Sequence, residues 1–386
     1  MRGVIGITTS LAAAFLVFSA PVNAVGEIND CGSFLAAIEG AEAGESLVLT
    51  GDIDCSANRN NNYTVIDKSL TIDLNGYDIL DYRNVFDVVA GTFRLTGDGM
   101  VSEENPWVSV VRVSGDNVNI VIDEGVTLSG WSGITMNATN NGKTSNIDFN
   151  GKIIARTDDD DGIGVGINLN GTNKDKVNFA HIKIGEKARI ESSGIGIYAP
   201  GYADWVIEGG SIVSEGAALA IKAGKFVING GEFRVTGENK IPVAALCSGV
   251  VASGAVIQIE SNNCYVGGIE IVVKGGSFVS ENGYVLYEYK ADGTQETKVE
   301  KLAFRGGEFS YGAGAMHISE ELELLLADFV DDYVASDSAG LLEEIASRGV
   351  SQMEWETSDG ESLKMKVAGA KAGEMLNVYF YSEPVA

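Results

Sequence analysis

The sequence is poor in histidine, in proline and in basic residues. Of 386 residues, two are His and five are Pro, and 27 Lys or Arg stand against 54 Asp or Glu, which gives a net charge of −27. An acidic excess of this size excludes a nucleic-acid binder that works by neutralising phosphates, and it disfavours attachment to anionic membranes. Two histidines are too few for a His-rich metal site. We therefore expect an acidic protein with no nucleic-acid partner.

Long apolar runs are also missing beyond the amino terminus. Residues 1–24 read as a signal peptide, because Arg2 precedes an apolar stretch at 11–18 and small residues end it at Ala24. An uncleaved anchor is the alternative interpretation. No later segment has 18 uncharged apolar residues, so we expect no transmembrane segment after cleavage and a secreted or cell-surface location.

Cysteine is scarce, with four in the chain. Secretion favours disulfide bonds, and two pairs are close in sequence: Cys31 with Cys55, and Cys247 with Cys264. We expect this local pairing out of three possible ones, each bond contributing roughly 3 kcal/mol by closing its loop. Free buried thiols are the alternative.

Glycine, in contrast, is abundant. The chain has 49 glycines without a collagen period, and such a number indicates many tight turns. Four segments share a Gly-Gly pair between two apolar stretches, and their first glycines are 21, 45 and 31 residues apart. These segments are Trp205–Ile212, Phe226–Phe233, Ile271–Phe278 and Leu302–Phe309, with looser copies around Gly76, Gly97, Gly125, Gly151 and Gly185.

Each repeat unit has the pattern of three short strands. Apolar residues alternate with period two before the Gly pair, and a second strand follows it. No helical stretch separates the units, so helical crossovers between parallel strands are excluded and a parallel β-helix is predicted. The third strand of successive units is expected at 195–197, 218–221, 243–246 and 285–287.

Stacking of the units explains the residues they share. Coils about 4.8 Å apart bury one continuous apolar column, in which Phe233, Phe278 and Phe309 are expected to stack. The glycine pairs are expected to adopt positive φ angles. The 45-residue interval, which holds Cys247 and Cys264, is either an insertion or an extra coil.

The repeats and the composition divide the chain into three regions. After the signal peptide at 1–24, residues 25–317 form the all-β parallel β-helix, with about ten coils of three short strands. A short helix at 33–38, followed by a strand at 46–49, is the amino-terminal cap. Residues 318–386 form a small acidic α+β module, with helices at 320–334 and 341–346 and strands at 353–357, 363–367 and 376–381.

The cap and the Gly-Gly-x-Phe units together resemble the right-handed parallel β-helix superfamily that includes pectin and pectate lyases, and within it the coil repeats of secreted bacterial surface proteins. The resemblance covers about residues 28–317. It implies a right-handed β-helix. It implies little about function, because this superfamily includes lyases, hydrolases, adhesins and phage fibres.

An enzyme of this kind needs residues that are only partly present. A polysaccharide lyase uses an Arg or Lys base and often Ca²⁺, for which Asp158, Asp159, Asp160 and Asp161 are the candidate ligands; a solvated loop is the alternative. Lys274 and Arg305 precede Gly pairs in one outward column with Glu208 and Asn229, and they are the candidate base or carboxylate-binding pair; ordinary surface charge is the alternative. The Gly-His-Gly and Arg-Ile-Lys motifs of polygalacturonases, which the aspartate run faintly resembles, are missing.

Two functions remain open. The first is a non-catalytic, secreted or cell-surface adhesin, structural protein or binder of a polysaccharide or host-cell glycan. The second is an extracellular lyase, or a glycoside hydrolase, that acts on polysaccharides containing uronic acid. Exposed aromatic side chains are expected in or near the third-strand loops, where they could stack on sugars in either case, with core or loop packing as the alternative. They are Trp131, Tyr198, Tyr202, Tyr284, Tyr287 and Tyr289.

Overall fold

The structure is a computed structural model of the chain. It describes most of residues 26–322 and two later strands. The described residues are 26–57, 64–81, 85–105, 108–136, 143–156, 163–169, 179–240, 252–260, 265, 267–289, 298–319 and 322, together with the backbone of 353–358 and 362–367.

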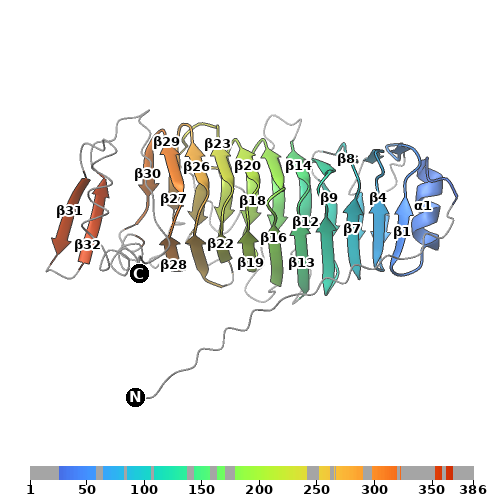
Figure 1. Ribbon diagram of the computed structural model, residues 1–386, viewed down its shortest axis with the longest axis horizontal. Helices are drawn as coiled ribbons and strands as arrows, with labels where there is room; N and C mark the ends of the chain where they lie inside the picture. The colour runs from blue at the N-terminus through green and yellow to red at the C-terminus, as the bar shows by residue number, and fades with distance from the viewer. Residues whose placement is uncertain are drawn as a thin grey trace, which may run out of the picture.

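Three parallel sheets of ten strands each form a parallel β-helix, as the repeats predicted (Figure 1). The chain visits the sheets in turn, so every third strand belongs to the same sheet. We call the sheets A, B and C, and we number the coils 1 to 10, so that coil 1 is β1–β2–β3 and coil 10 is β28–β29–β30. Strands of successive coils pair in parallel register, which places equivalent repeat residues directly above one another.

The strands are short in all three sheets. Sheet A contains β1 (Glu45–Val48), β4 (Leu70–Asp73), β7 (Thr92–Thr96), β10 (Val118–Ile122), β13 (Thr144–Phe149), β16 (Phe179–Ile184), β19 (Ala203–Ile207), β22 (Gly224–Ile228), β25 (Ile269–Val273) and β28 (Val299–Phe304). Sheet B contains β2 (Ile53–Asp54), β5 (Ile79–Asp81), β8 (Gly99–Glu103), β11 (Val126–Gly130), β14 (Lys152–Ala155), β17 (Arg189–Ser192), β20 (Ser211–Ser214), β23 (Glu232–Val235), β26 (Ser277–Ser280) and β29 (Glu308–Tyr311). Sheet C contains β3 (Thr64–Ile66), β6 (Phe86–Val88), β9 (Ser109–Val113), β12 (Ser132–Met136), β15 (Val165–Leu169), β18 (Ile195–Ala199), β21 (Ala217–Ile221), β24 (Ile257–Glu260), β27 (Tyr284–Tyr289) and β30 (Gly314–His317).

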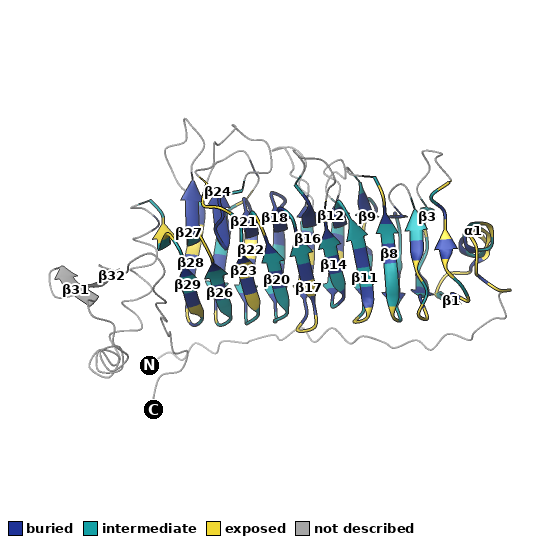
Figure 2. Ribbon diagram, turned by 90° about the horizontal axis from the view of Figure 1, so that it is seen from above, coloured by how far each residue is buried: buried dark blue, intermediate teal, exposed yellow. Residues whose placement is uncertain are grey.

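The core is one column inside the three sheets (Figure 2). Alternate residues of each strand point inward, and the coil register stacks them into ladders. Phe278 lies between Phe233 and Phe309, with ring centroids 4.7 and 5.3 Å away, which confirms the predicted phenylalanine ladder. A second ladder runs through all ten coils of sheet A: Leu47, Ile72, Leu95, Ile122, Phe149, Ile184, Ile207, Ile228, Val273 and Phe304.

The Gly-Gly pairs make the turn from sheet A to sheet B. Positive φ was expected for the pairs and is found at the second glycine of each, not at the first: +83° at Gly210, +115° at Gly231, +111° at Gly276 and +126° at Gly307. A Cβ at Gly210 would also lie 2.5 Å from the carbonyl oxygen of Ala188 in the coil below. Both conformation and close packing therefore require glycine there.

The 45-residue interval is an insertion and not an extra coil. Phe226 pairs directly with Ile271, so the segments before and after the interval are adjacent coils. The third strand of this coil is β24 at Ile257–Glu260 and not the predicted 243–246, a segment that lies outside the described residues. Apolar composition alone could not decide between two apolar stretches in the same interval.

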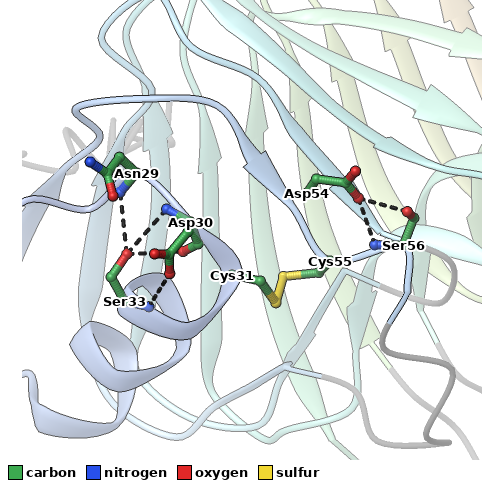
Figure 3. Close-up of a disulfide and its surroundings, with 7 residues drawn as sticks. All are labelled: Asn29, Asp30, Cys31, Ser33, Asp54, Cys55 and Ser56. Atoms are coloured by element: carbon green, nitrogen blue, oxygen red, sulfur yellow. Dashed lines mark hydrogen bonds between the residues drawn. A yellow bond between two sulfur atoms is a disulfide. The ribbon is translucent and has the colours of Figure 1, made fainter.

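A helix covers the first coil, as predicted. Helix α1 (Cys31–Gly40) begins with a capping box between Asp30 and Ser33 (Figure 3). At its other end the Lys68 ammonium donates to the carbonyl of Ala41 at 3.0 Å. The predicted Cys31–Cys55 disulfide ties the helix to the segment after β2. Cys247 and Cys264 lie outside the described residues.

The opposite end of the column is closed by residues after β30. Leu322 is fully buried and belongs to the hydrophobic core, against which Ile318 also packs. The strands predicted at 353–357 and 363–367 are present as β31 (Met353–Ser358) and β32 (Ser362–Val367), which pair antiparallel. The predicted helices at 320–334 and 341–346, apart from Leu322, and the strand at 376–381 lie outside the described residues, as do residues 1–24.

Candidate functional site

A groove follows the corner between sheets A and B in the middle of the rod. It has a volume of about 1060 Å³. One wall is formed by the turns that join the two sheets, and the floor is the first outward row of sheet B. The lining comes from coils 3 to 8, between Asp98 at one end and Glu232 at the other. An open groove that crosses several coils suits an extended ligand better than a small molecule.

The floor of the groove is one ladder of polar side chains. Coil register places five residues above one another: Thr127, Lys152, Arg189, Ser211 and Glu232. Lys152 and Arg189 are direct neighbours in this ladder, although like charges opposite each other destabilise a sheet. The Glu191 carboxylate, which lies on the same strand as Arg189 and binds Lys152, offsets part of this repulsion.

The two cations differ in their partners. Lys152 is bound by Glu191 at 2.8 Å, and Arg156 lies 3.9 Å from the same carboxylate. Arg189 is exposed and has no ion pair among the described residues. Lys187 on the wall is 4.0 Å from Glu124, two coils away, and both side chains are mostly exposed. The Glu191 carboxylate is therefore shared by Lys152 and Arg156. The Arg189 guanidinium remains accessible to a ligand.

The groove crosses two coils that carry a net positive charge in a chain of net charge −27. The relevant part of each coil runs from one residue before its sheet A strand to one residue after its sheet B strand. Coils 5 and 6 carry six bases and three acids, a net +3, whereas the same parts of coils 4 and 7 carry two and three acids and no base. The bases are Lys143, Lys152, Arg156, Lys183, Lys187 and Arg189, and the acids are Asp148, Glu186 and Glu191.

This basic band was not predicted from the sequence. The six bases are separated by up to 46 residues, and only the coil register brings them onto two neighbouring coils. A charge count for each repeat unit would have found the band, because the looser units around Gly151 and Gly185 contain all of these bases.

Lys274 and Arg305 lie where the repeat pattern placed them. The backbone N–H groups of Asn229, Lys274 and Arg305 each donate to the preceding coil at the end of sheet A, which stacks them above Glu208 as predicted. Both basic side chains are exposed. They lie in coils 9 and 10, beyond the coils that line the groove. The structure therefore does not join them to the basic band.

The calcium candidates Asp158–Asp161 lie outside the described residues. Within the described part of the chain, no group of three or more His, Cys, Asp or Glu side chains could hold a metal ion. None of the described helices is long and apolar enough to cross a membrane.

The aromatic candidates are less exposed than we expected. Tyr198, Tyr287 and Tyr289 are buried, and the expectation of exposure was wrong for them. They lie on the outer face of sheet C, where Tyr198 packs with Trp131 in one apolar cluster and Tyr287 with Tyr284 in another. Strand alternation correctly places such residues outside the column, but it does not reveal that an outer face is covered. Trp131, Tyr202 and Tyr284 are half-buried.

A buried ionic cluster lies on the same outer face of sheet C. The Lys222 ammonium is 2.5 Å from the Glu260 carboxylate, and both side chains are almost fully buried. Tyr289 donates a hydrogen bond of 2.8 Å to Glu260, and the rings of Tyr198 and Tyr265 flank Lys222. Burial lowers the pKa of Lys222, although the Glu260 carboxylate opposes this shift.

Lys298 stands beside this cluster. Its ammonium lies 5.5 Å from the centre of the Tyr265 ring and donates to the Tyr265 carbonyl at 3.3 Å. Burial lowers the pKa of Lys298 to about 8, and burial likewise raises the pKa of Tyr265 to about 12. Lys298 precedes β28, at the corner of sheets C and A, whereas the groove follows the corner of sheets A and B.

No protein-family model matches the chain, and no significant match was found among curated proteins or among solved structures. The parallel β-helix fold is therefore established by the register of the strands alone.

Proposed function

We propose that this chain is a secreted or cell-surface protein that binds an acidic glycan in the groove of coils 3 to 8 and catalyses no reaction on it. The observation that carries the proposal is the groove floor, where Lys152 and Arg189 lie in direct register inside a chain of net charge −27. Anionic groups of a polymer that lies along the rod neutralise this pair.

The wall of the groove is mixed in charge. Asp98, Glu124 and Glu186 line it beside Lys187, and carboxylates accept hydrogen bonds from sugar hydroxyls but repel anionic groups. The anions of the glycan are therefore expected at Lys152 and Arg189 on the floor, with its hydroxyls toward the wall. The run Asp158–Asp161, which lies outside the described residues, follows Arg156 in the sequence and adds four acids between coils 5 and 6. The acidic remainder of the surface repels a polyanion, so binding should be confined to the basic band.

Binding to immobilised polysaccharides tests the proposal. The probes are polygalacturonate, a sulfated glycosaminoglycan and neutral dextran. We expect binding to the first two that weakens as salt rises, and none to dextran. Arg189→Glu should weaken binding by roughly tenfold or more, because it places an anion on the groove floor.

Arg234→Glu is the matched control. Arg234 is an exposed sheet B residue outside the groove lining, 2.5 Å from Glu281. Arg234→Glu changes the net charge by the same amount as Arg189→Glu. Because Arg234 lies outside the groove, its substitution should leave the affinity for the polysaccharide almost unchanged. Equal loss in both variants, or equal binding of dextran, would contradict the proposal.

A polysaccharide lyase is the second candidate, and the Lys298 amine favours it. A lysine whose pKa is about 8 serves as a base near neutral pH, and the Tyr265 ring beside it carries a hydroxyl. Ultraviolet absorbance of an unsaturated product, followed in the same polygalacturonate samples with and without Ca²⁺, separates the two candidates. Product that forms with the unaltered protein and not with Lys298→Ala would establish the lyase and overturn the non-catalytic proposal.

A further inference from the structure

The outer face of sheet A in coils 7 to 10 carries three parallel rows of side chains. The central row is mostly aliphatic, and the rows on either side are charged or polar. In coil order, the first row is Asp204, Lys225, Glu270 and Lys301. The central row is Val206, Val227, Val272 and Ala303, and the third row is Glu208, Asn229, Lys274 and Arg305.

Much of this face is open to solvent. Lys225, Lys274, Lys301 and Arg305 are exposed, and the three valines are partly exposed. Ala303 is buried already. An aliphatic row between two charged rows has the composition of an interface core with a polar rim.

The charges are complementary to a copy of the same face. A two-fold axis along the strand direction, between coils 8 and 9, would place coil 7 against coil 10 and coil 8 against coil 9. Each row then meets its own copy. Asp204 faces Lys301, Lys225 faces Glu270, and Glu208 faces Arg305 of the second copy, so every fully charged pair is of opposite sign.

The central row fits the same arrangement. Val227 faces Val272 at the centre, whereas Val206 would lie over Ala303, which its own chain already buries, so the aliphatic contact comes from the valines. Within one copy, Lys225 and Glu270 form an ion pair of 2.7 Å. The two-fold axis would bring two such pairs together with opposite polarity, which closes a square of four alternating charges.

The opposite arrangement of the two rods is disfavoured. An axis parallel to the rods would place the first row against the third row. Asp204 would then face Glu208, and Lys301 would face Arg305, so that like charges meet in both of these coils. The charge pattern therefore selects antiparallel rods.

We propose that this face of sheet A is a self-association surface whose partner is a second, antiparallel copy of the chain. The two faces would form an isologous interface. Twelve side chains on each copy are fewer than the 20–30 residues of a standard interface, so the dimer should be weak and depend on concentration. This inference does not depend on the groove, which lies on sheet B and its turns.

Charge-reversal variants, compared with the unmodified chain, test the proposed self-association. Analytical ultracentrifugation over a range up to about 100 μM should show reversible dimers of the unmodified chain. Lys225→Glu alone and Glu270→Lys alone should each raise the dimer dissociation constant at least tenfold, because each places two like-charged pairs in the interface.

Combining the substitutions should restore the dimer. An equimolar mixture of Lys225→Glu and Glu270→Lys chains would form a heterodimer in which every facing pair is again of opposite sign. The double variant Lys225→Glu/Glu270→Lys should also dimerise. A protein that stays monomeric at all concentrations, single variants that dimerise as well as the unmodified chain, or a mixture that does not recover would each overturn the proposal. Thermal unfolding of each variant confirms that the fold is intact.

Discussion

Phe278 shows how one side chain depends on three coils at once. It is fully buried, and it stacks on Phe233 below and on Phe309 above. Phe278→Ala should lower the free energy of unfolding by roughly 3–5 kcal/mol, because a cavity would open between two aromatic rings. Val279→Ala on the outer face of the same strand is the control and should cost about 0.5 kcal/mol or less. Urea unfolding curves measure both. Equal effects would contradict an internal ladder.

Glu103 gives the rod a dependence on pH. Burial raises the pKa of Glu103 to about 7, although the backbone N–H groups of Trp131 and Asn105 donate to its carboxylate and oppose the shift. The folded state therefore binds a proton that the unfolded state has released. The contribution of Glu103 to the free energy of unfolding is fully present below about pH 4.5 and is lost as the pH rises through 7. The total loss is about 3 kcal/mol.

Glu103→Gln removes this titration. The difference in unfolding free energy between the unmodified chain and the variant should change by about 3 kcal/mol between pH 4.5 and pH 8, with the unmodified chain losing more. Denaturant unfolding at these two pH values measures it. A difference that stays constant with pH would show that Glu103 does not titrate in this window.

Individual roles were predictable where the repeat dictated them. The inward position of Phe233 and the positive φ of Gly210 follow from alternation and from turn geometry. The burial of Tyr198 and Tyr289 does not, because segments distant in the sequence decide whether an outward residue is covered. The Lys222–Glu260 pair joins residues 38 apart across an insertion of irregular length, and no local pattern marks it.

The amino-terminal cap is the element most dependent on a covalent bond. Helix α1 buries only Phe34 and Ile38 against the first coil, and the Cys31–Cys55 bond holds it in place. Cys31→Ser/Cys55→Ser should destabilise the cap by about 3 kcal/mol. Hydrogen exchange should then rise in residues 31–54 and stay unchanged in β16–β22, because each coil contacts only its neighbours. Faster exchange along the whole rod would contradict this local role.

The positions of the strands were predictable from the sequence where glycine turn signals mark their ends. Gly-Gly pairs fixed the passage from sheet A to sheet B in coils 7 to 10. The passage from sheet B to sheet C has no such signal, and there the predicted strand at 243–246 proved to be β24 at Ile257–Glu260. Strand pairing across long insertions depends on the register of the whole coil, which no segment specifies alone.

At the scale of the molecule, the surface properties arise from stacking. The basic band, the groove floor and the self-complementary face of sheet A are each assembled from residues 20 to 50 positions apart that the coil register brings together. The sequence predicted the rod but not these surfaces, since their charges become neighbours only after the insertions are placed. A slip of one residue in any coil would turn its outward residues inward.

A designed disulfide on the groove floor tests this register most directly. Ser211 and Glu232 are paired across β20 and β23, where parallel strands about 4.8 Å apart suit a disulfide. Ser211→Cys/Glu232→Cys should oxidise to an internal bond, identified by mass spectrometry of the linked peptides, whereas Ser211→Cys/Arg234→Cys, offset by two residues, should stay reduced. A bond in the offset pair, or none in the paired variant, would contradict the stacked coils on which the groove and both proposals depend.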